Sequence, residues 1–295
     1  MRADGRDAGG SAAGASGALS RDMNLLVKTV AYEFRKRIQF RTGFFVREVL
    51  NGVVEPLVML FVFGAIYRSA SPTGDAEQAV LGSWSYPEIV KYVAGLLIVM
   101  KLVFNNRGLD LSTEIFEGRI TKYLTMPFRY FVLIQGRFVQ FTIMQVMVSG
   151  LVWCIAYGLM GDRWLVPVSW VATGQALTLV LLGSYCCFLL YVILNTLAFW
   201  LDVVWSLLVM AWFVISFTGG AVMPVSQMPA WVASTFSYAF PYWTISAPIE
   251  ILMGRLGTDA FLRGVLIVGL QLVLLDVLRR FTWRRGLAHY VGAGM

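Results

Sequence analysis

Charged side chains are scarce in this sequence: they make up 14% of its 295 residues, while 58% are apolar. A soluble domain normally carries about 25% charged and about 45–50% apolar residues. The composition therefore argues against an ordinary soluble globule and indicates a membrane protein. The net charge of +7 does not by itself indicate a nucleic-acid partner, because the basic residues flank apolar runs.

Histidine and cysteine are also rare. The one histidine, His289, lies near the C-terminus, which argues against a histidine-built metal site or a Ser/His/Asp triad in the body of the chain. The three cysteines lie inside apolar runs, and Cys186 and Cys187 are adjacent, a spacing that fits neither a disulfide framework nor a metal site. We therefore expect no catalytic residue, no metal and no cofactor in this chain.

A phosphate-binding loop is absent as well. No Gly-x-x-x-x-Gly-Lys-Ser/Thr occurs, since none of the five lysines follows a glycine. Without such a loop the chain cannot hold nucleotide phosphates in the manner of a P-loop protein. Any ATP that its activity requires must be hydrolysed by a separate protein.

Long apolar runs, by contrast, are abundant. A helix that crosses a membrane needs about 20 predominantly apolar residues, and six runs of that kind are bounded by charged or turn residues. They cover residues 44–67, 88–106, 130–160, 165–194, 199–222 and 260–280. The sequence predicts an all-α integral membrane protein whose six transmembrane helices lie in residues 44–285.

The two ends of the chain have different compositions. Residues 1–21 are rich in Ala, Gly and Ser and predict a disordered tail. Residues 22–43 repeat apolar side chains every fourth position, as at Leu26 and Val30, with basic residues on other faces. This pattern favours an amphipathic helix in the membrane interface over a soluble packing helix. Residues 286–295 are predicted to form a cytoplasmic C-terminal tail.

Basic residues are distributed unevenly around the predicted spans. Eighteen of the 24 Lys and Arg lie in three segments, which are the N-terminus through Arg47, Arg107 through Arg137, and Arg279 through Arg285. Cytoplasmic loops retain positive charge, so six crossings place all three segments and both termini in the cytoplasm. We expect a multi-pass protein of a bacterial-type inner (plasma) membrane.

The cytoplasmic segment between the second and third runs has an apolar stripe. Leu111 and Ile115 begin it, and Ile120 and Leu124 continue it beyond an interruption at Gly118. The charged residues there are Glu114, Glu117, Arg119 and Lys122. The pattern is typical of a short helix under the membrane with a charged face available to a partner, and equally of a solvated interfacial loop.

Prolines punctuate an apolar, aromatic stretch before the last run. The four prolines are Pro224, Pro229, Pro241 and Pro248. This stretch is too broken for one spanning helix and too apolar for an exposed loop. It favours short re-entrant helices at the outer face, with a belt of interfacial Trp and Tyr as the alternative.

A few polar and aromatic residues in the runs are candidates for a translocation path or a buried polar site. They are Glu48, Asn51, Glu55, Lys101, Trp205 and Trp212. Polar groups in hydrocarbon normally turn inward toward a partner or water. One hypothesis pairs Lys101 with Glu48 or Glu55, and snorkelling of Lys101 to the surface is its alternative. Helix packing explains the two tryptophans as well as an aromatic path does.

The order of these features resembles the permease subunit of ABC-2 type exporters over residues 22–285. The motifs that carry the resemblance are Glu117-Gly118-Arg119 before Met126-Pro127, then Gly219-Gly220, Met223-Pro224, Met228-Pro229-Ala230-Trp231, Phe240-Pro241-Tyr242 and Ala247-Pro248. The resemblance implies that the segment between spans two and three is a coupling helix. Its residues Glu114, Glu117, Gly118 and Arg119 would then contact an ATPase subunit.

The same resemblance implies further features. The proline-punctuated stretch would form an extracellular re-entrant hairpin, and two permease subunits would assemble with two ATPase subunits, which bind ATP and Mg. Substrate would leave by alternating access along spans two and five. An ion-coupled secondary transporter using Glu55 and Lys101 is the alternative. An integral membrane enzyme would need a polar catalytic cluster, which the sequence lacks.

Overall fold

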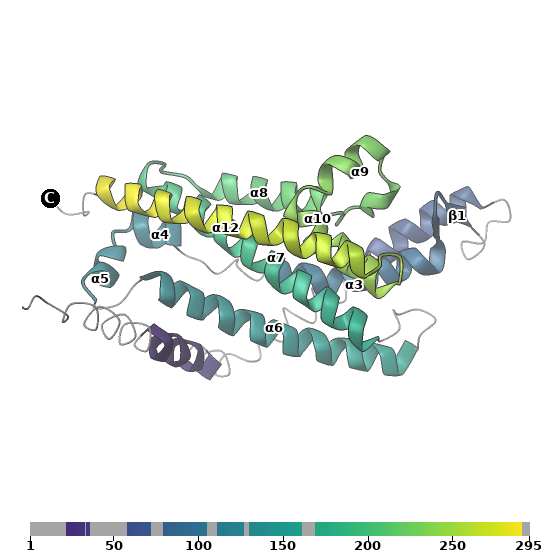
Figure 1. Cartoon of the computed structure of the whole chain (residues 1–295), viewed down its shortest axis with the longest axis horizontal. Helices are drawn as coiled ribbons and strands as arrows, with labels where there is room; N and C mark the ends of the chain where they lie inside the picture. The colour runs from purple at the N-terminus through teal and green to yellow at the C-terminus, as the bar shows by residue number, and fades with distance from the viewer. Residues whose placement is uncertain are drawn as a thin grey trace, which may run out of the picture.

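Helices make up most of the chain in this computed structural model. The structure describes residues 22–32, 34–35, 58–71, 79–104, 111–126, 130–160 and 169–290. The three longest of the described helices run along the long axis of the molecule (Figure 1). They are α6 (Tyr130–Met160), α7 (Trp170–Thr196) and α12 (Thr258–His289).

These three helices are long and apolar enough to cross a membrane. The stretches that qualify are Tyr130–Leu151, Trp170–Phe199, which includes the 3-10 turn η3 (Leu197–Phe199), and Thr258–His289. Two shorter apolar helices are Val58–Ala70 and α8 (Trp205–Thr218). The structure is therefore mostly helical, as predicted for a membrane protein, with three clear span candidates in the described part of the chain.

Helix α3 (Tyr86–Val103) is long enough for a span but carries Glu88, Lys91 and Lys101. Its N-terminus is capped, since the Ser85 backbone N–H donates to Glu88 Oε2 at 2.9 Å. Glu88 also pairs with Arg255 at 2.9 Å. The charge at this end of α3 is therefore satisfied by neighbouring groups.

A short antiparallel ladder precedes α3. Strand β1 (Val80–Leu81) pairs with β2 (Trp84–Ser85), with Val80 opposite Ser85 and Leu81 opposite Trp84. The Trp84 side chain is fully buried, and its ring lies 3.9 Å from the Arg255 guanidinium carbon. The ladder thus ties the start of α3 to the segment just before α12.

The helix bounds agree with the predicted runs in some places and not in others. Helix α6 has the predicted bounds, whereas α8 is shorter at both ends than the predicted run 199–222. Its C-cap is Gly219, and Gly220 follows with a φ of +84°, a left-handed conformation that ends a helix. Helix α12 continues to His289, past the predicted start of the C-terminal tail at residue 286. Within this helix Asp276 forms ion pairs with Arg279 and Arg280, which stabilise the helix.

Helix α7 forms the centre of the described fold. In the most apolar 18-residue window of α7, 61% of the residues are buried, whereas the share in α12 is 11%. Helix α7 packs along α12 and also contacts α3 and two short helices, α10 (Phe240–Thr244) and α11 (Ser246–Leu252). Helix α12 consequently presents most of its apolar surface outward, as a lipid-facing helix does.

The cysteines follow this division between centre and periphery. Cys186 and Cys187 of α7 are buried, whereas Cys154 of α6 is exposed, and all three are free thiols. The two buried cysteines occupy core positions, where a free cysteine packs as a small apolar side chain.

The proline-punctuated stretch forms four short helices between α8 and α12. They are η4 (Val225–Gln227), α9 (Ala230–Phe236), α10 and α11. Pro224 and Pro229 directly precede η4 and α9, and Pro241 and Pro248 lie in the first turns of α10 and α11. Proline is tolerated at such positions because the first turn leaves its N–H groups without helical partners.

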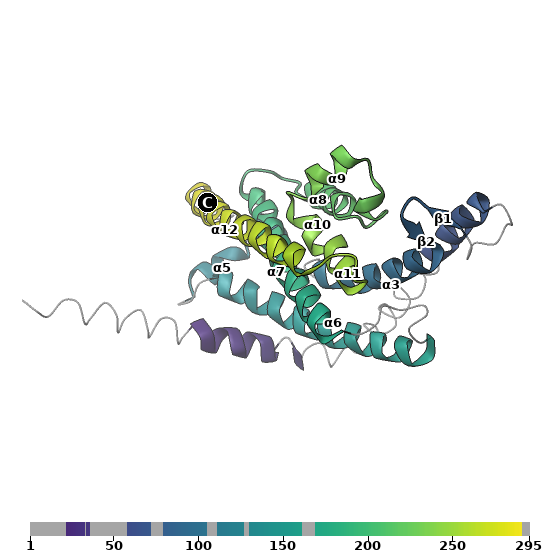
Figure 2. The same cartoon turned by 45° about the vertical axis from the view of Figure 1, so that its right-hand side comes forward.

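The N-terminal helix of residues 22–32 lies beside α6 in both views (Figures 1 and 2). Its half-buried side chains include Leu26, Thr29 and Val30. Thr29 packs so closely on Gly136 of α6 that an added Cβ there would lie 3.0 Å from it. The amphipathic helix therefore packs its inner face on another helix.

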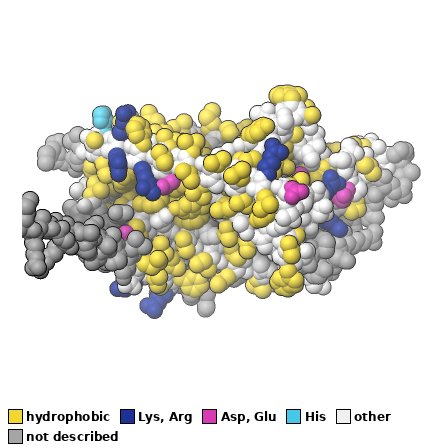
Figure 3. Space-filling view, viewed as in Figure 1, with side chains coloured by type: hydrophobic (Ala, Val, Ile, Leu, Met, Phe, Trp, Pro, Cys, Tyr) yellow, Lys and Arg dark blue, Asp and Glu magenta, His cyan; other side chains and the backbone are white. Residues whose placement is uncertain are grey.

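Apolar side chains also dominate the surface. Figure 3 shows them over the middle of the molecule, with Lys, Arg, Asp and Glu toward its two ends. Exposed apolar side chains on α12 include Leu266, Leu270, Val273 and Leu274. An apolar band between two charged ends is the surface expected of a protein that crosses a bilayer.

A buried carboxylate lies in α11, one of the short helices between two span candidates. Glu250 is 4% exposed and accepts a hydrogen bond at 3.3 Å from Ser226 Oγ, which in turn accepts one at 3.1 Å from Trp84 Nε1. Burial raises the pKa of Glu250 from 4.5 to about 7, although Ser226 and Arg255 oppose the shift.

The raised pKa of Glu250 predicts a pH-dependent stability. The folded state holds the proton more tightly than the unfolded state, so stability falls as pH rises from 4.5 to about 7. Glu250→Gln keeps an acceptor for Ser226 without the charge, and at pH 8 it should raise the unfolding free energy by on the order of 2–3 kcal/mol. Thermal unfolding in detergent at pH 8 and at pH 4.5 measures this gain, which should disappear at the lower pH.

Glu88→Gln is the matched control for this prediction, because it removes the same charge at a carboxylate paired with Arg255. It should lower rather than raise stability at pH 8. Equal effects of both variants would contradict the role assigned to burial at Glu250.

Candidate coupling site

The α4–α5 element, residues 111–124, consists of α4 (Leu111–Phe116), a turn and α5 (Ile120–Leu124). Gly118 in the turn has a φ of 72°, a conformation that residues with a Cβ rarely adopt. Its backbone N–H donates to the Ile115 carbonyl at 3.1 Å. The interruption predicted at Gly118 is therefore a left-handed turn between two short helices.

The inner side of the α4–α5 element is apolar and buried. Leu111, Ile115 and Ile120 are at most 5% exposed. They belong to one cluster with side chains of α6 and α7, among them Ile134, Phe188, Leu189 and Val192. Leu124, the last residue of the predicted stripe, is instead exposed. The inner side holds the element firmly on the long helices.

Glu114 differs from the expectation that it faces a partner. Its side chain is buried, accepts a hydrogen bond from Tyr130 Oη and pairs with Arg137 Nη1 at 3.4 Å. Leu111, Glu114 and Ile115 are spaced i, i+3 and i+4 and therefore share one helical face. Glu114 fastens α4 to the start of α6 and does not belong to the exposed surface.

Three further polar contacts fasten the element to α7 and to Tyr290, which directly follows α12. The Ser112 backbone N–H donates to Asn195 Oδ1 at 3.3 Å. Tyr290 Oη donates to the Gly118 carbonyl at 3.3 Å and lies 2.9 Å from Thr121 Oγ1. Sequence reasoning missed Tyr290, because it lies about 170 positions from its partners and no local pattern links them.

The outer side of the α4–α5 element is exposed. Glu117 and Arg119 form an ion pair at 2.5 Å, with side chains 48% and 58% exposed. Phe116 is 65% exposed, and Lys122 is exposed as well. Sequence reasoning also missed Phe116. This residue lies outside the apolar stripe of Leu111 and Ile115, and that position could have identified it as an exposed aromatic side chain. We call Phe116, Glu117, Arg119 and Lys122 the outer face.

The candidate residues Lys101, Trp205 and Trp212 are described by the structure and do not belong to the outer face. Lys101 lies in the last turn of α3, where a cation complements the helix dipole. Trp205 is 72% exposed, whereas Trp212 packs on the core, with its ring 6.2 Å from that of Phe104. Glu48, Asn51 and Glu55 lie outside the described residues, so the proposed Lys101 pair stays a hypothesis.

The contact between Glu114 and Tyr130 predicts a measurable stability loss. In Tyr130→Phe the buried carboxylate keeps only the 3.4 Å contact with Arg137 among the described residues, and we expect a loss of about 1–3 kcal/mol in unfolding free energy. Tyr123→Phe is the control, because the Tyr123 ring packs against the Tyr130 ring at a centroid distance of 5.1 Å and no hydrogen bond of its hydroxyl occurs in the described part of the chain. An equal loss in both variants would assign the effect to ring packing.

The α4–α5 element is thus a rigid surface feature, with a buried apolar inner side and an exposed, charged outer face. Its residue types do not favour catalysis of a covalent reaction. Its outer face can bind a protein, and its buried inner side can transmit a displacement to α6, α7 and α12.

Comparison with known proteins agrees with this geometry. Residues 53–294 match the protein family described as ABC-2 family transporter protein. No curated protein matches the chain. The family match covers most of the chain, including the α4–α5 element and the four short helices before α12. The resemblance indicated by the sequence motifs is confirmed, and the chain belongs to the ABC-2 transporter family as a membrane component that transports and is not itself catalytic.

Proposed function

We propose that this chain is the permease subunit of an ATP-binding-cassette exporter, in which a separate ATPase subunit docks on the outer face. The proposal rests on the surface of the α4–α5 element. Its inner side is fixed to three long helices, and its outer face exposes an aromatic side chain beside an ion pair. Family membership supports the same assignment.

The proposal includes six spans with both termini in the cytoplasm. Helices α6, α7 and α12 supply three. Helix α3, α8 and the helix that contains Val58–Ala70 supply the others, and α9, α10 and α11 form the re-entrant hairpin at the outer face of the membrane. Two copies of the chain enclose a path along α3 and α8.

Work in this subunit is conformational. ATP and Mg bind in the partner, whose closure displaces the outer face. The buried contacts of Ile115, Ile120 and Glu114 transmit the displacement to the long helices and bias the packing between inward-open and outward-open states.

Reconstitution tests the proposal. The purified chain alone should hydrolyse no ATP, and it should co-purify with a co-expressed ATP-binding-cassette subunit and yield substrate-stimulated hydrolysis. A point variant of the ATPase that binds but cannot hydrolyse ATP is the control, and it should assemble without transport. Export driven by an ion gradient in the absence of any ATPase would contradict the proposal and favour a secondary transporter.

A further inference from the structure

A large cavity lies at the end of the molecule that carries the α4–α5 element. Its volume is about 1470 Å³, which exceeds the roughly 300–1,000 Å³ of an ordinary small-molecule pocket. Its walls come from α5, α6, α7, α12 and the helix of residues 22–32. Three of these walls are predominantly apolar helices, so the cavity lies where lipid would meet the protein.

One face of α12 changes character along the cavity. Val273, Val277 and Phe281 line its first part and are at least half exposed. Arg280 and Arg284 follow on the same face, since the spacings from Val273 are i+7 and i+11. An apolar wall that ends in cationic groups matches the layout of a phospholipid, whose acyl chains end in a charged headgroup.

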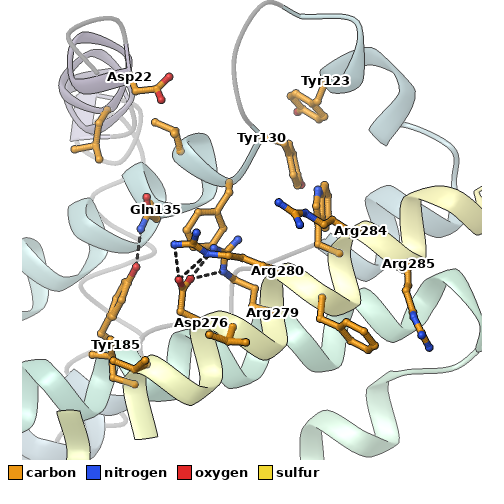
Figure 4. A pocket seen from close by; sticks show the side chains of 18 of the residues that line it. Asp22, Tyr123, Tyr130, Gln135, Tyr185, Asp276, Arg279, Arg280, Arg284 and Arg285 are labelled. Atoms are coloured by element: carbon orange, nitrogen blue, oxygen red, sulfur yellow. Dashed lines mark hydrogen bonds and ion pairs between the residues drawn. The ribbon is translucent and has the colours of Figure 1, made fainter. Parts of the chain in front are cut away.

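Two of the arginines share one carboxylate. Arg279 and Arg280 converge on Asp276 (Figure 4), with contacts of 2.6 and 2.7 Å. Arg279 is also stacked on the Phe131 ring at 3.5 Å. This cluster keeps one net positive charge, but both of its guanidinium groups are held by contacts within the protein.

The next two arginines are different. Arg284 and Arg285 line the cavity and are exposed. Neither has a carboxylate partner among the described residues, and Arg285 contacts the Phe281 ring, at 4.4 Å. Two uncompensated guanidinium groups beside an apolar wall favour an anionic ligand with an apolar body, because guanidinium binds phosphate strongly.

We propose that this cavity binds an anionic phospholipid, with its phosphate at Arg284, a second cationic group nearby at Arg285, and an acyl chain along Val273 and Val277. Basic pockets between membrane helices at the cytoplasmic surface bind anionic headgroups in this manner. The site adjoins Tyr123 and Leu124 of the α4–α5 element, so the lipid would contact the same segment that we assign to coupling. The inference needs only that the chain lies in a membrane, and not that an ATPase docks on it.

Native mass spectrometry of the full chain in nonionic detergent tests the site. Dioleoyl phosphatidylglycerol should bind about thirtyfold more tightly than dioleoyl phosphatidylcholine, since two Arg near a membrane surface together contribute about 2 kcal/mol toward anionic lipid. Arg284→Gln/Arg285→Gln should abolish this preference. The control Arg68→Gln/Arg263→Gln removes two exposed arginines elsewhere and should leave the preference unchanged.

A second variant tests the apolar wall. Val277→Trp places a bulky side chain on the proposed path of the acyl chain without changing charge, and it should weaken both lipids several-fold. Equal affinity of the unaltered chain for the two lipids, or equal losses in both arginine variants, would overturn the proposal. Displacement of phosphatidylglycerol by excess inorganic phosphate would reduce the site to a free-anion site. Loss of self-association or of ATPase binding in Arg284→Gln/Arg285→Gln, with lipid preference intact, would assign the arginines to a protein partner instead.

Discussion

Exchanging the two charges of the ion pair on the outer face, as Glu117→Arg/Arg119→Glu, should leave the chain folded but lower substrate-stimulated ATP hydrolysis by at least about tenfold. The exchange preserves net charge and allows the internal ion pair to form in reverse. It inverts only the charge pattern that a docked ATPase meets, and like charges placed together across an interface cost several kcal/mol.

The measurements are membrane insertion, co-purification with the ATPase and hydrolysis with and without substrate. Asp259→Arg/Arg263→Asp is a matched control. These residues are an exposed i, i+4 pair at the start of α12, outside the α4–α5 element. Normal assembly and normal stimulated hydrolysis in the Glu117 and Arg119 exchange would remove the basis for the coupling assignment. Glu114 is left out of the exchange, because a charge reversal at this buried residue would disturb folding.

Phe116 gives an independent measure of the same surface. An exposed aromatic side chain beside charged residues is a typical anchor of a protein interface, and its truncation to Ala should weaken ATPase binding by about 2 kcal/mol. Thr113→Ala, at an exposed position in the same helix, should change the affinity little.

Gly183→Ala should lower the free energy of unfolding by about 2–4 kcal/mol, a large loss for the addition of one methyl group. Gly183 lies in α7, and a Cβ there would overlap the Oγ1, Cβ and Cγ2 atoms of Thr244 in α10. Thr244 cannot turn away freely, because it is buried and its hydroxyl donates to the Phe240 carbonyl at 2.7 Å. The overlap must therefore be relieved by separating two packed helices.

The control for this prediction is Gly174→Ala in the same helix, where nothing lies within 4 Å of an added Cβ. That change should be neutral or stabilising by up to about 1 kcal/mol, since Ala favours helix over Gly. Adding Thr244→Ala to Gly183→Ala should restore part of the loss, because it removes two of the three overlapping atoms. Equal unfolding temperatures for Gly183→Ala and Gly174→Ala would contradict the close approach of α7 and α10.

Long helices were predictable from the sequence because uninterrupted apolar runs leave few alternatives, and α6 has the predicted bounds at Tyr130 and Met160. Element ends were less predictable. The run through 199–222 looks continuous in composition, but η3 and the left-handed Gly220 shorten the helix within it. Composition does not distinguish an apolar residue in a turn from one in a helix.

The sequence predicted the turn of the candidate site well, but it predicted less well which of the charged side chains are exposed. Gly118 marked the break, and Glu117 and Arg119 are exposed as expected. Glu114 was misplaced because its partners Tyr130 and Arg137 come from the next long helix. Distances along the chain do not reveal such contacts, so charge alone was taken as a sign of exposure.

The contrast between the three cysteines makes spectroscopy on the native sequence practical. Cys186 and Cys187 are enclosed by core side chains, while the Cys154 thiol lies at the surface of α6. A membrane-permeant maleimide should therefore modify one position in the folded chain and three after denaturation. A fluorophore or spin label at Cys154 would report how α6 moves during the transport cycle, without a cysteine-free background having to be engineered first.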